Sequence, residues 1–300
     1  MFKAKRKQKR VMAQNAVIAR DKQLILANQY LQSALNSQRP GVGNDKPHEI
    51  IVSLTTFDKR IANVYLTIES IFQQALRPDR VILWISEEDF GENDIPEILR
   101  LQQQRGLEIG FMPKDIGPYG KFYYTLERHP ESLIVTVDDD HIYPHDMVDM
   151  LYRTWLEDPH TIPCHRAHKI SFDSQGQLLP YKEWQKSTTD TKPSLLTFPT
   201  GIGGVLYFPG CFDEAILDKE LFLSLCPHAD DVWLKAMSLK KGTPCKRVRE
   251  YRNFGTRFLT VHDSQVAALK KGNKRGASNN DTKLKAVWDH FNLWDKMPKG

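Results

Sequence analysis

The chain has 300 residues, 40% of them hydrophobic, which is enough for one large domain or two small ones. Its net charge of +5 comes from one end, because six of the 42 basic residues lie in the first ten positions. The remaining sequence carries 36 basic and 37 acidic residues, a net charge of −1. This balance excludes a general nucleic-acid-binding surface on the globular part.

Cysteine usage and hydropathy predict the compartment. The four cysteines, at positions 164, 211, 226 and 245, are far apart and form no CxxC pair, so neither a zinc site nor a disulfide framework is expected. No apolar run approaches the roughly 20 residues that cross a bilayer. The basic start also lacks the apolar segment of a secretory signal. The sequence therefore predicts a cytoplasmic protein with reduced thiols.

Residues 1–38 are rich in Lys, Arg, Gln and Ala, and apolar residues recur there at steps of three and four, from Val11 and Val17 to Leu24 and Leu35. This spacing predicts an amphipathic helix. Residues 38–47 resemble a linker in composition, so we divide the chain into a basic helical extension, 1–47, and one domain, 48–300. Two interpretations of the helix stay open: a solvated oligomerisation segment, or a peripheral anchor on the anionic inner face of the cell membrane.

From residue 49 onward, short runs of β-forming residues alternate with helical patterns. Strands are expected at 50–55, 81–85, 107–112 and 133–137, and helices at 61–74, 95–104 and 121–128. This order predicts an α/β fold, Rossmann-like, with a mainly parallel sheet covered by helices on both faces. The second half predicts mixed α+β structure, with extended segments at 165–173, 204–208, 243–249 and 257–261 and helices at 214–225, 231–241 and 283–293.

The fourth expected strand ends in three consecutive carboxylates, Asp138, Asp139 and Asp140, and Pro144 then opens a helix. Side chains alternate along an extended segment, so Asp138 and Asp140 are expected to point the same way and Asp139 the other. Two carboxylates at the carboxyl end of a strand suit Mn²⁺ or Mg²⁺ that holds phosphate oxygens. In the alternative, one Asp caps the helix and the others face water, but a cap needs only one of three acids that repel each other.

Other phosphate-binding patterns are missing from the sequence. It contains neither GxxxxGK[ST] nor GxGxxG, and the glycines of residues 200–204 have the wrong spacing and follow Pro199 rather than a strand. Haloacid-dehalogenase-type phosphatases also use a DxD motif, but on the first strand. A metal-dependent phosphohydrolase therefore stays as an alternative enzyme, and a non-catalytic membrane- or partner-docking protein as the alternative outside enzymes.

Five segments occur in an order that is typical of one protein family. They are VSLTTFDKR (52–60), DIGPYGK (115–121), VDDD (137–140), PTGIGGVLY (199–207) and ADDVWL (229–234). Together they resemble the nucleotide-sugar-dependent glycosyltransferases of the GT-A fold, family 2-like, that occur in bacterial surface-polysaccharide gene sets. The resemblance covers residues 49–293. It implies that a sugar moves from a nucleoside-diphosphate donor, expected to be UDP-linked, to a glycan or lipid-linked acceptor.

The resemblance also implies roles on the donor side. Asp138, Asp139 and Asp140 resemble the DxD motif, with Asp140 and Asp138 nearest to a metal that neutralises the leaving diphosphate. The family's nucleoside-binding loop matches Thr55, Thr56 and Arg60 here, and Lys121 matches a diphosphate- or base-binding residue at a helix start. Arg60 could equally be a solvated residue of a helix N-terminal turn. For Lys121 the residue type alone favours a surface lysine, but the match to the motif favours a binding role. His262 resembles a further metal ligand, although a lone histidine is more often a hydrogen-bonded loop residue.

On the acceptor side, Asp231 matches the acceptor-activating base of inverting relatives, and the adjacent Asp230 would raise its pKa. The alternative is that one of the two caps the following helix. The glycines from Gly201 to Gly204, above all Gly203 and Gly204, would let the backbone approach the donor sugar, or would form a tight turn. Trp184 is a candidate to stack on an acceptor sugar. Many inverting enzymes have Glu-Asp where this chain has Asp-Asp, so inversion is expected but retention stays open.

Overall fold

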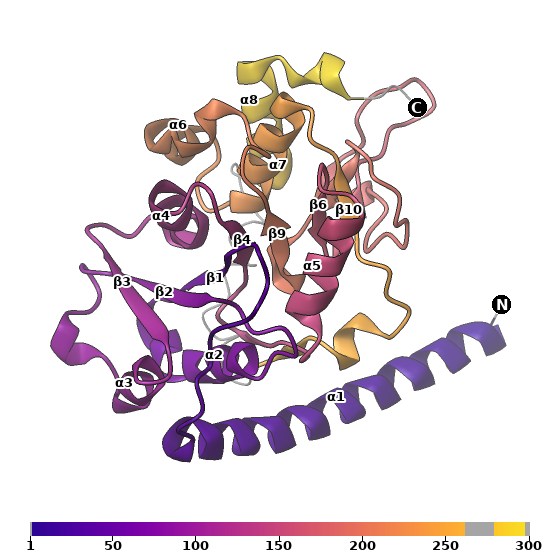
Figure 1. Cartoon of the computed structure of the whole chain (residues 1–300). Helices are drawn as coiled ribbons and strands as arrows, with labels where there is room; N and C mark the ends of the chain where they lie inside the picture. Colours follow the sequence, from indigo (N-terminus) through magenta and orange to yellow (C-terminus); the bar gives the residue numbers. More distant parts are fainter. Residues whose placement is uncertain (1, 262–278, 298–300) are drawn as a thin grey trace.

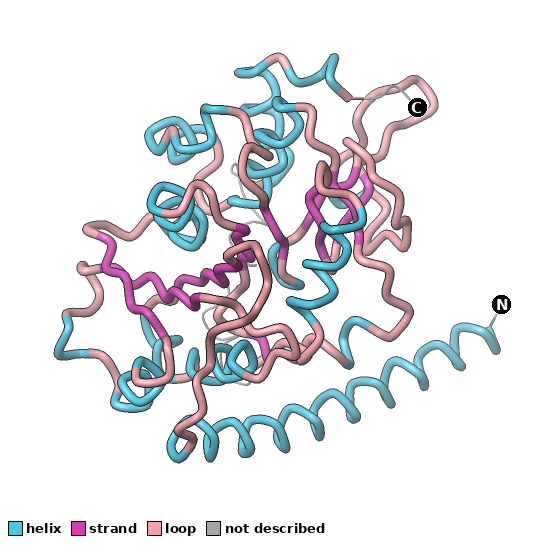
Figure 2. Tube along the Cα trace, viewed as in Figure 1, coloured by secondary structure: helices cyan, strands magenta, loops and turns pink. Residues whose placement is uncertain are grey.

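The computed structural model describes residues 2–261 and 279–297 and shows an α/β architecture around a seven-stranded sheet (Figures 1 and 2). The strand order is β10-β6-β9-β4-β1-β2-β3. Its strands are β1 (Ile50–Thr55), β2 (Arg80–Ser86), β3 (Leu107–Met112), β4 (Leu133–Thr136), β6 (Ile162–Cys164), β9 (Val205–Tyr207) and β10 (Cys245–Arg247). Two small antiparallel sheets pair β5 (His141–Ile142) with β11 (Leu259–Thr260), and β7 (Ala167–Lys169) with β8 (Thr197–Pro199).

Helices cover both faces of the large sheet, as predicted. They are α1 (Phe2–Asn36), α2 (Val64–Phe72), α3 (Glu97–Gln103), α4 (Gly120–Arg128), α5 (Met147–Glu157), α6 (Lys219–Leu225), α7 (Asp230–Lys241) and α8 (Asn280–Phe291). Along β1, Ile50, Val52 and Leu54 pack on the face of α2, α3 and α5, whereas Ile51 packs on the face of α4 and α7. The period of two along a strand divides its side chains between the two cores.

The first four strands of the large sheet confirm the predicted parallel half. Strand β1 pairs in parallel with both β2 and β4, and β2 pairs in parallel with β3. The chain thus runs outward from β1 to β3 and returns to β4 on the other side of β1. This reversal creates a topological switch point between the carboxyl ends of β1 and β4, where open α/β sheets bind their ligands.

The second half is mixed, and some predicted boundaries are wrong. Strand β9 runs antiparallel to β4 and β6. The helix expected to open at Pro144 begins at Met147, because His141 and Ile142 pair with β11 before the chain can turn into a helix. The expected helix 214–225 is divided, since the Asp218 side chain accepts a hydrogen bond from the backbone N–H of Leu221 (3.0 Å) and caps a new helix there.

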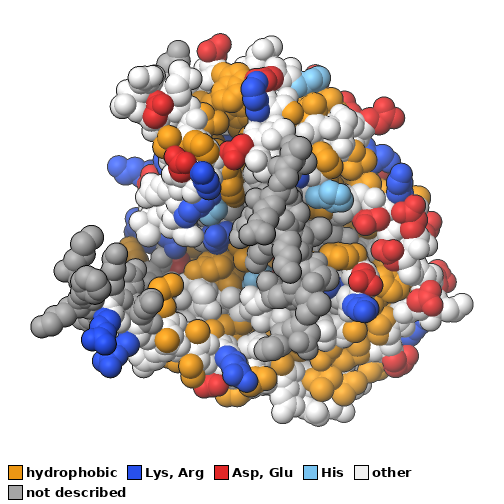
Figure 3. All heavy atoms as spheres, turned by 180° about the vertical axis from the view of Figure 1, so that it is seen from behind, with side chains coloured by type: hydrophobic (Ala, Val, Ile, Leu, Met, Phe, Trp, Pro, Cys, Tyr) orange, Lys and Arg blue, Asp and Glu red, His pale blue; other side chains and the backbone are white. Residues whose placement is uncertain are grey.

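Helix α1 runs continuously from Phe2 to Asn36, and its N-terminal end projects past the body (Figure 1). Its contacts use a different stripe from the predicted one. Near its C-terminal end Tyr30 and Ala34 are buried, whereas Val17 and Leu24 are 59% and 52% exposed. Basic side chains also lie along the described part of the helix, at the lower left of Figure 3. Among the described residues, no helix combines the length and apolar character needed to cross a bilayer.

Candidate active site

A cleft of about 800 Å³ opens at the switch point of the sheet. Each of the five segments that carry the family resemblance contributes to its wall. The contributions are Thr55–Phe57 and Arg60; Asp115, Gly117, Pro118 and Lys121; Val137–Asp140; Thr200–Ile202; and Asp230 and Asp231. Segments that are far apart in the sequence therefore meet at one site.

The three consecutive carboxylates lie in the loop between β4 and β5, which buried hydroxyl groups hold in place. The Thr67 hydroxyl on α2 donates to the backbone carbonyls of Asp139 (2.9 Å) and His141 (2.8 Å). The Tyr143 hydroxyl accepts a hydrogen bond from the backbone N–H of Asp138 (2.8 Å). Because buried backbone groups are costly to leave unpaired, these contacts fix the direction of the loop.

Asp139 points toward the loop after β1. Its Oδ2 accepts a hydrogen bond from the Thr56 hydroxyl (2.7 Å), and its Oδ1 accepts one from Arg60 Nη1 (2.5 Å). Arg60 Nη2 lies 3.2 Å from Asp140 Oδ2. Burial raises the pKa of Asp139 to about 6, against the opposing influence of Arg60 and Thr56. Thr56 and Arg60 thus position the acidic loop, and Arg60 is 9% exposed rather than a solvated surface residue.

Asp138, Asp140 and His141 form a group that fits a divalent cation. One ligand atom of each residue lies within 4.8 Å of the other two, so Asp138 and Asp140 face the same point, as the alternation predicted. Two carboxylate oxygens with an imidazole nitrogen suit Mn²⁺, and the carboxylates alone also suit Mg²⁺. The expected ligand His262 lies outside the described residues. His141 was passed over in the sequence, although it directly follows the acids.

The charge balance of this part of the cleft also fits a cation. Besides His141, whose Nδ1 lies 2.5 Å from Asp140 Oδ1, Arg60 and Lys121 form the ion pairs of the loop and its surroundings. The carboxylates that they contact are those of Asp138, Asp139, Asp140 and Asp230. Among the described residues, two fixed positive charges therefore face four carboxylates. Carboxylates crowded in a buried site repel one another, and a divalent cation would neutralise the excess.

Lys121 connects the two acidic groups of the cleft. Its Nζ lies 2.8 Å from Asp138 Oδ1 and 3.0 Å from Asp230 Oδ2, and its side chain is 5% exposed. Burial by itself would lower the pKa of Lys121, but Asp138, Asp230 and Asp231 together raise it well above the ordinary value. A buried lysine held by carboxylates of two different segments is a permanent positive charge, not a solvated surface residue.

Asp230 and Asp231 begin α7, and neither caps it, because the residue before the helix is Ala229 and no side chain makes a capping hydrogen bond. The Asp231 carboxylate turns instead to the segment after β8 and accepts a hydrogen bond from the backbone N–H of Gly201 (3.0 Å). Burial, and next the charge of Asp230, raises the pKa of Asp231 well above the usual range of a carboxyl group. Such a shift makes a carboxylate a stronger base.

Gly201 marks the point where the acidic groups converge. A Cβ atom at this position would lie 3.4 Å from each of three atoms: Asp138 Oδ1, Asp231 Oδ1 and Lys121 Nζ. A carboxylate of the cation-binding group and the candidate base therefore border the same small volume. Glycine leaves that volume open to the cleft.

Of the remaining predicted residues, Thr55, Gly203 and Gly204, only Thr55 lines the cleft. The Thr55 hydroxyl lines the cleft but donates to the backbone carbonyl of Trp84 (3.0 Å), so it belongs to the sheet edge. Gly203 packs against His165, and Gly204, with φ +85°, packs against Met147. Neither of these two glycines borders the cleft, and among the glycines of this segment Gly201 does.

Several cleft residues were missed in the sequence. Arg166, Tyr181 and Lys186 line the wall beside Asp231. Trp184, the expected sugar-stacking residue, is 3% exposed and donates its indole N–H to the carbonyl of Leu179 (2.8 Å). Tyr181, and not Trp184, is the aromatic residue of this segment that lines the cleft. The alternation of aromatic and basic residues in YKEWQK (181–186) was the available signal.

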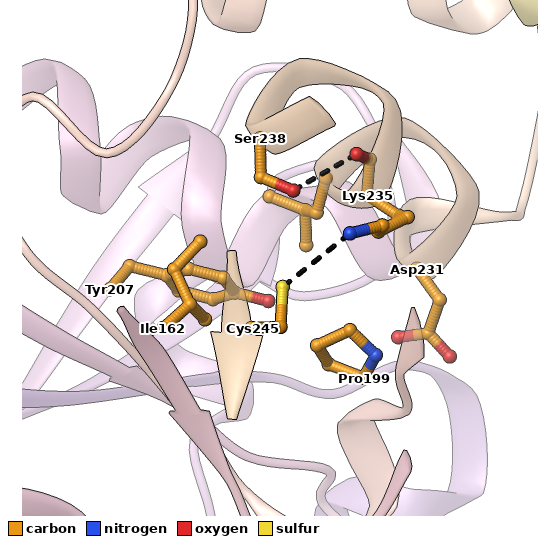
Figure 4. A pocket seen from close by; sticks show the side chains of 8 residues that line it. Ile162, Pro199, Tyr207, Asp231, Lys235, Ser238 and Cys245 are labelled. Atoms are coloured by element: carbon orange, nitrogen blue, oxygen red, sulfur yellow. Dashed lines mark hydrogen bonds between the residues drawn. The ribbon is translucent and has the colours of Figure 1, made fainter. Parts of the chain in front are cut away.

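Lys235 lies one helical turn beyond Asp231, and Figure 4 shows its side chain directed toward Cys245. Its amine is buried, 3.7 Å from Cys245 Sγ, beside a cavity of about 10 Å³. Burial lowers the pKa of Lys235. A cavity of this size holds at most about one water molecule. Lys235 therefore belongs to the structural support of α7 and not to the ligand-binding wall.

No protein-family profile and no curated protein sequence matches the chain. Among solved structures, it is similar to S. aureus TarS 1–349 in complex with UDP, at 11% identity and a TM-score of 0.44. The alignment covers 68% of this chain and 58% of that one, so less than two thirds of the TarS structure is matched. The same TarS segment without a named ligand matches at 12% identity, with a TM-score of 0.43 and coverages of 71% and 60%.

A mannosyltransferase from Pyrobaculum calidifontis, PcManGT, solved in complex with GDP-Man and Mn²⁺, is also similar. The identity is 12% and the TM-score is 0.43, over 93% of this chain and 80% of the other. Similarity at this level leaves the activity to be argued from the residues of the cleft.

Proposed function

We propose that the chain is a metal-dependent glycosyltransferase of the GT-A type, which transfers a sugar from a nucleoside-diphosphate donor to a glycan or lipid-linked acceptor. The convergence at Gly201 carries the proposal. One cleft, at the switch point of the sheet, brings a carboxylate of a cation-binding group, a buried lysine and a carboxylate with a raised pKa to the same point. The reaction is a displacement at the anomeric carbon of the donor sugar. We call the residues that would bind the donor diphosphate the donor half of the site, and those that would bind and activate the acceptor the acceptor half.

The donor half consists of the loop after β4 and the residues that hold this loop in place. Asp138, Asp140 and His141 would hold Mn²⁺ or Mg²⁺, which supplies neutralisation of the charge that develops on the leaving diphosphate. Arg60 holds Asp139 in place through Nη1 and Asp140 through Nη2. Because this arrangement exists before the donor arrives, little reorganisation is needed when the bond breaks.

The acceptor half depends on Asp231. In its ionised form this carboxylate removes the proton of the attacking hydroxyl group, while the Gly201 N–H keeps Asp231 Oδ1 in place. Lys121 lies between the donor and acceptor halves and keeps Asp138 and Asp230 from repelling each other. A base that is separate from the cation-binding group supports inversion of the anomeric centre, and we propose a UDP-sugar donor and a place in surface-polysaccharide synthesis.

Incubation with UDP- and GDP-sugars tests the proposal directly. We expect slow release of the nucleoside diphosphate that requires Mn²⁺ or Mg²⁺ and stops with EDTA. Phosphate release from simple phosphomonoesters, without use of any nucleotide sugar, would instead indicate a phosphohydrolase. Calorimetry that detects no binding of UDP in the presence of Mn²⁺ would indicate a non-catalytic protein.

We also propose that α1 docks the domain of residues 48–300 on an anionic membrane surface. Met12 and Val17 are 66% and 59% exposed, and they follow a first segment with six basic residues. Exposed apolar groups next to cationic ones are the two contributions that bind a helix to an anionic interface. Met12→Asp combined with Val17→Asp should reduce sedimentation with phosphatidylglycerol vesicles at low salt. Unchanged binding to vesicles, or loss of a dimer in the variant, would favour self-association instead.

A further inference from the structure

One wall of the cleft carries positive charges that the proposed mechanism does not use. Arg166, just before β7, and Lys186, after the segment 181–183, both line the cleft. Among residues 2–261 and 279–297, no carboxylate lies within the 4.0 Å of an ion pair from either of them. This is unlike Arg60 and Lys121, which each contact two carboxylates. The wall thus presents to the cleft two cations that form no ion pair with a described carboxylate.

The two cations are held in place by the fold. Arg166 Nη1 donates to the Thr200 hydroxyl (3.0 Å), and the backbone carbonyl of Arg166 accepts from the N–H of Thr200 (3.0 Å). The Lys186 ammonium donates to the backbone carbonyl of Tyr181 and lies 3.5 Å from the centre of its ring. Since the side chains are already ordered, a ligand that binds them loses little extra rotamer entropy to their ordering.

The positive charge of Arg166 acts on Lys186. Burial lowers the pKa of Arg166, and burial together with the charge of Arg166 lowers the pKa of Lys186 to about 8. The other ionisable groups whose charges act on Arg166 or Lys186 are Tyr181, Asp231 and Asp281, and both cations act in turn on His168, which also lines the cleft. Two like charges that are partly removed from water destabilise each other, and an anion between them would relieve this repulsion.

The position of this wall assigns it to the acceptor half. Arg166 Nη1 donates to the hydroxyl of Thr200, and the N–H of the next residue, Gly201, donates to Asp231, the candidate base, so Arg166 and Asp231 are held by adjacent residues. The donor half already has its own cations in Arg60 and Lys121. Tyr181 also lies near Asp231 and offers an aromatic face beside it, of the kind on which sugar rings stack.

We propose that the acceptor carries a phosphate or carboxylate group close to its attacking hydroxyl, and that Arg166 and Lys186 bind this anion while Tyr181 contacts the sugar ring. The inference rests on the proposed function and specifies its acceptor as an anionic sugar. An arginine fork matches the oxygens of both anions, which explains why Arg is placed at the more buried of the two positions.

Binding experiments separate this inference from the proposed function. The wild-type protein is first saturated with UDP and Mn²⁺, and methyl phosphate or glucuronate is then titrated by calorimetry. We expect both anions to bind beside UDP, and Arg166→Met and Lys186→Met each to weaken this binding at least tenfold without changing the affinity for UDP. Lys192→Met, an exposed lysine outside the cleft, is the matched control and should behave as the wild type.

Three outcomes would overturn the inference and leave the proposed function intact: methyl phosphate that competes with UDP, anion binding that survives both substitutions, or no anion binding beside UDP. Failure of UDP itself to bind would reject the proposed function. In transfer assays, Arg166→Met should raise KM for a sugar phosphate or a uronic acid and leave KM for the neutral parent sugar unchanged. A polyprenyl-phosphate-linked sugar, compared with a soluble sugar phosphate, shows which source of the anion the wall accepts.

Discussion

Replacing Asp231 with asparagine changes one charge at the floor of the cleft and almost nothing in its shape. The asparagine Oδ1 can still accept the hydrogen bond that Asp231 Oδ1 accepts from the Gly201 N–H (3.0 Å). The repulsion between Asp231 and Asp230, one of the causes of the raised pKa, disappears. The variant should therefore fold, bind UDP with Mn²⁺ as the wild type does, and lack the base that activates the acceptor.

The expected loss of activity follows from the role of a general base. Such a group contributes about 10²–10⁴-fold, which corresponds to about 3–5 kcal/mol in the transition state. The thermal stability of the variant, in contrast to its activity, should increase. The pKa of Asp231 is higher in the folded than in the unfolded chain. Ionisation of Asp231 therefore lowers the free energy of unfolding, and this loss grows as pH rises above the pKa of the unfolded chain. In metal-free buffer, Asp231→Asn should thus raise Tm more at pH 8.5 than at pH 4.

The assay combines three measurements on the same variant: transfer with a panel of UDP- and GDP-sugars, thermal shift with UDP and Mn²⁺, and Tm against pH with EDTA. Asp213→Asn is a suitable control, because this carboxylate pairs with Lys240 away from the cleft. Turnover within a factor of about three of the wild type would refute the role of Asp231 as base, since a lost base costs at least about 10²-fold. Loss of UDP binding would show that its role lies with the donor.

Three further predictions concern other parts of the chain. Asp140→Asn should abolish the rise in Tm that Mn²⁺ causes, because it removes a carboxylate of the cation-binding group; an unchanged rise would place the cation elsewhere. Glu69→Gln should lower the free energy of unfolding by about 3–5 kcal/mol, measured by urea denaturation, because the fully buried Glu69 pairs with Arg105 (2.8 Å) and would leave it unpaired. Lys235→Met should raise Tm more at pH 7 than at pH 10.5. Burial lowers the pKa of Lys235 in the folded chain, so protonation of the amine destabilises the fold once pH falls below the pKa of the unfolded chain. An equal rise in Tm at both pH values would contradict this burial of the amine.

Local patterns in the sequence were enough to predict the parallel half of the fold. Strand β3 occupies the predicted residues 107–112, and β1 the predicted residues 50–55. Runs of buried β-forming residues between helical patterns leave few alternatives, because each element must bury its apolar side chains against the others. The order of the five segments likewise predicted that Arg60, Lys121, Asp138 and Asp231 belong to one kind of site.

Only the tertiary structure decided how these residues are paired. Asp138 and Asp230 are held by one lysine, Gly201 and not Gly203 borders the cleft, and the wall of Arg166, Tyr181 and Lys186 lies beside Asp231. The stripe of α1 that packs on the body also differs from the most apolar one. The periodicity of a segment reports which of its residues can be buried together. Which side chains of other segments they contact depends on the free energies of alternative tertiary contacts. These contacts form between distant segments only when the whole chain folds.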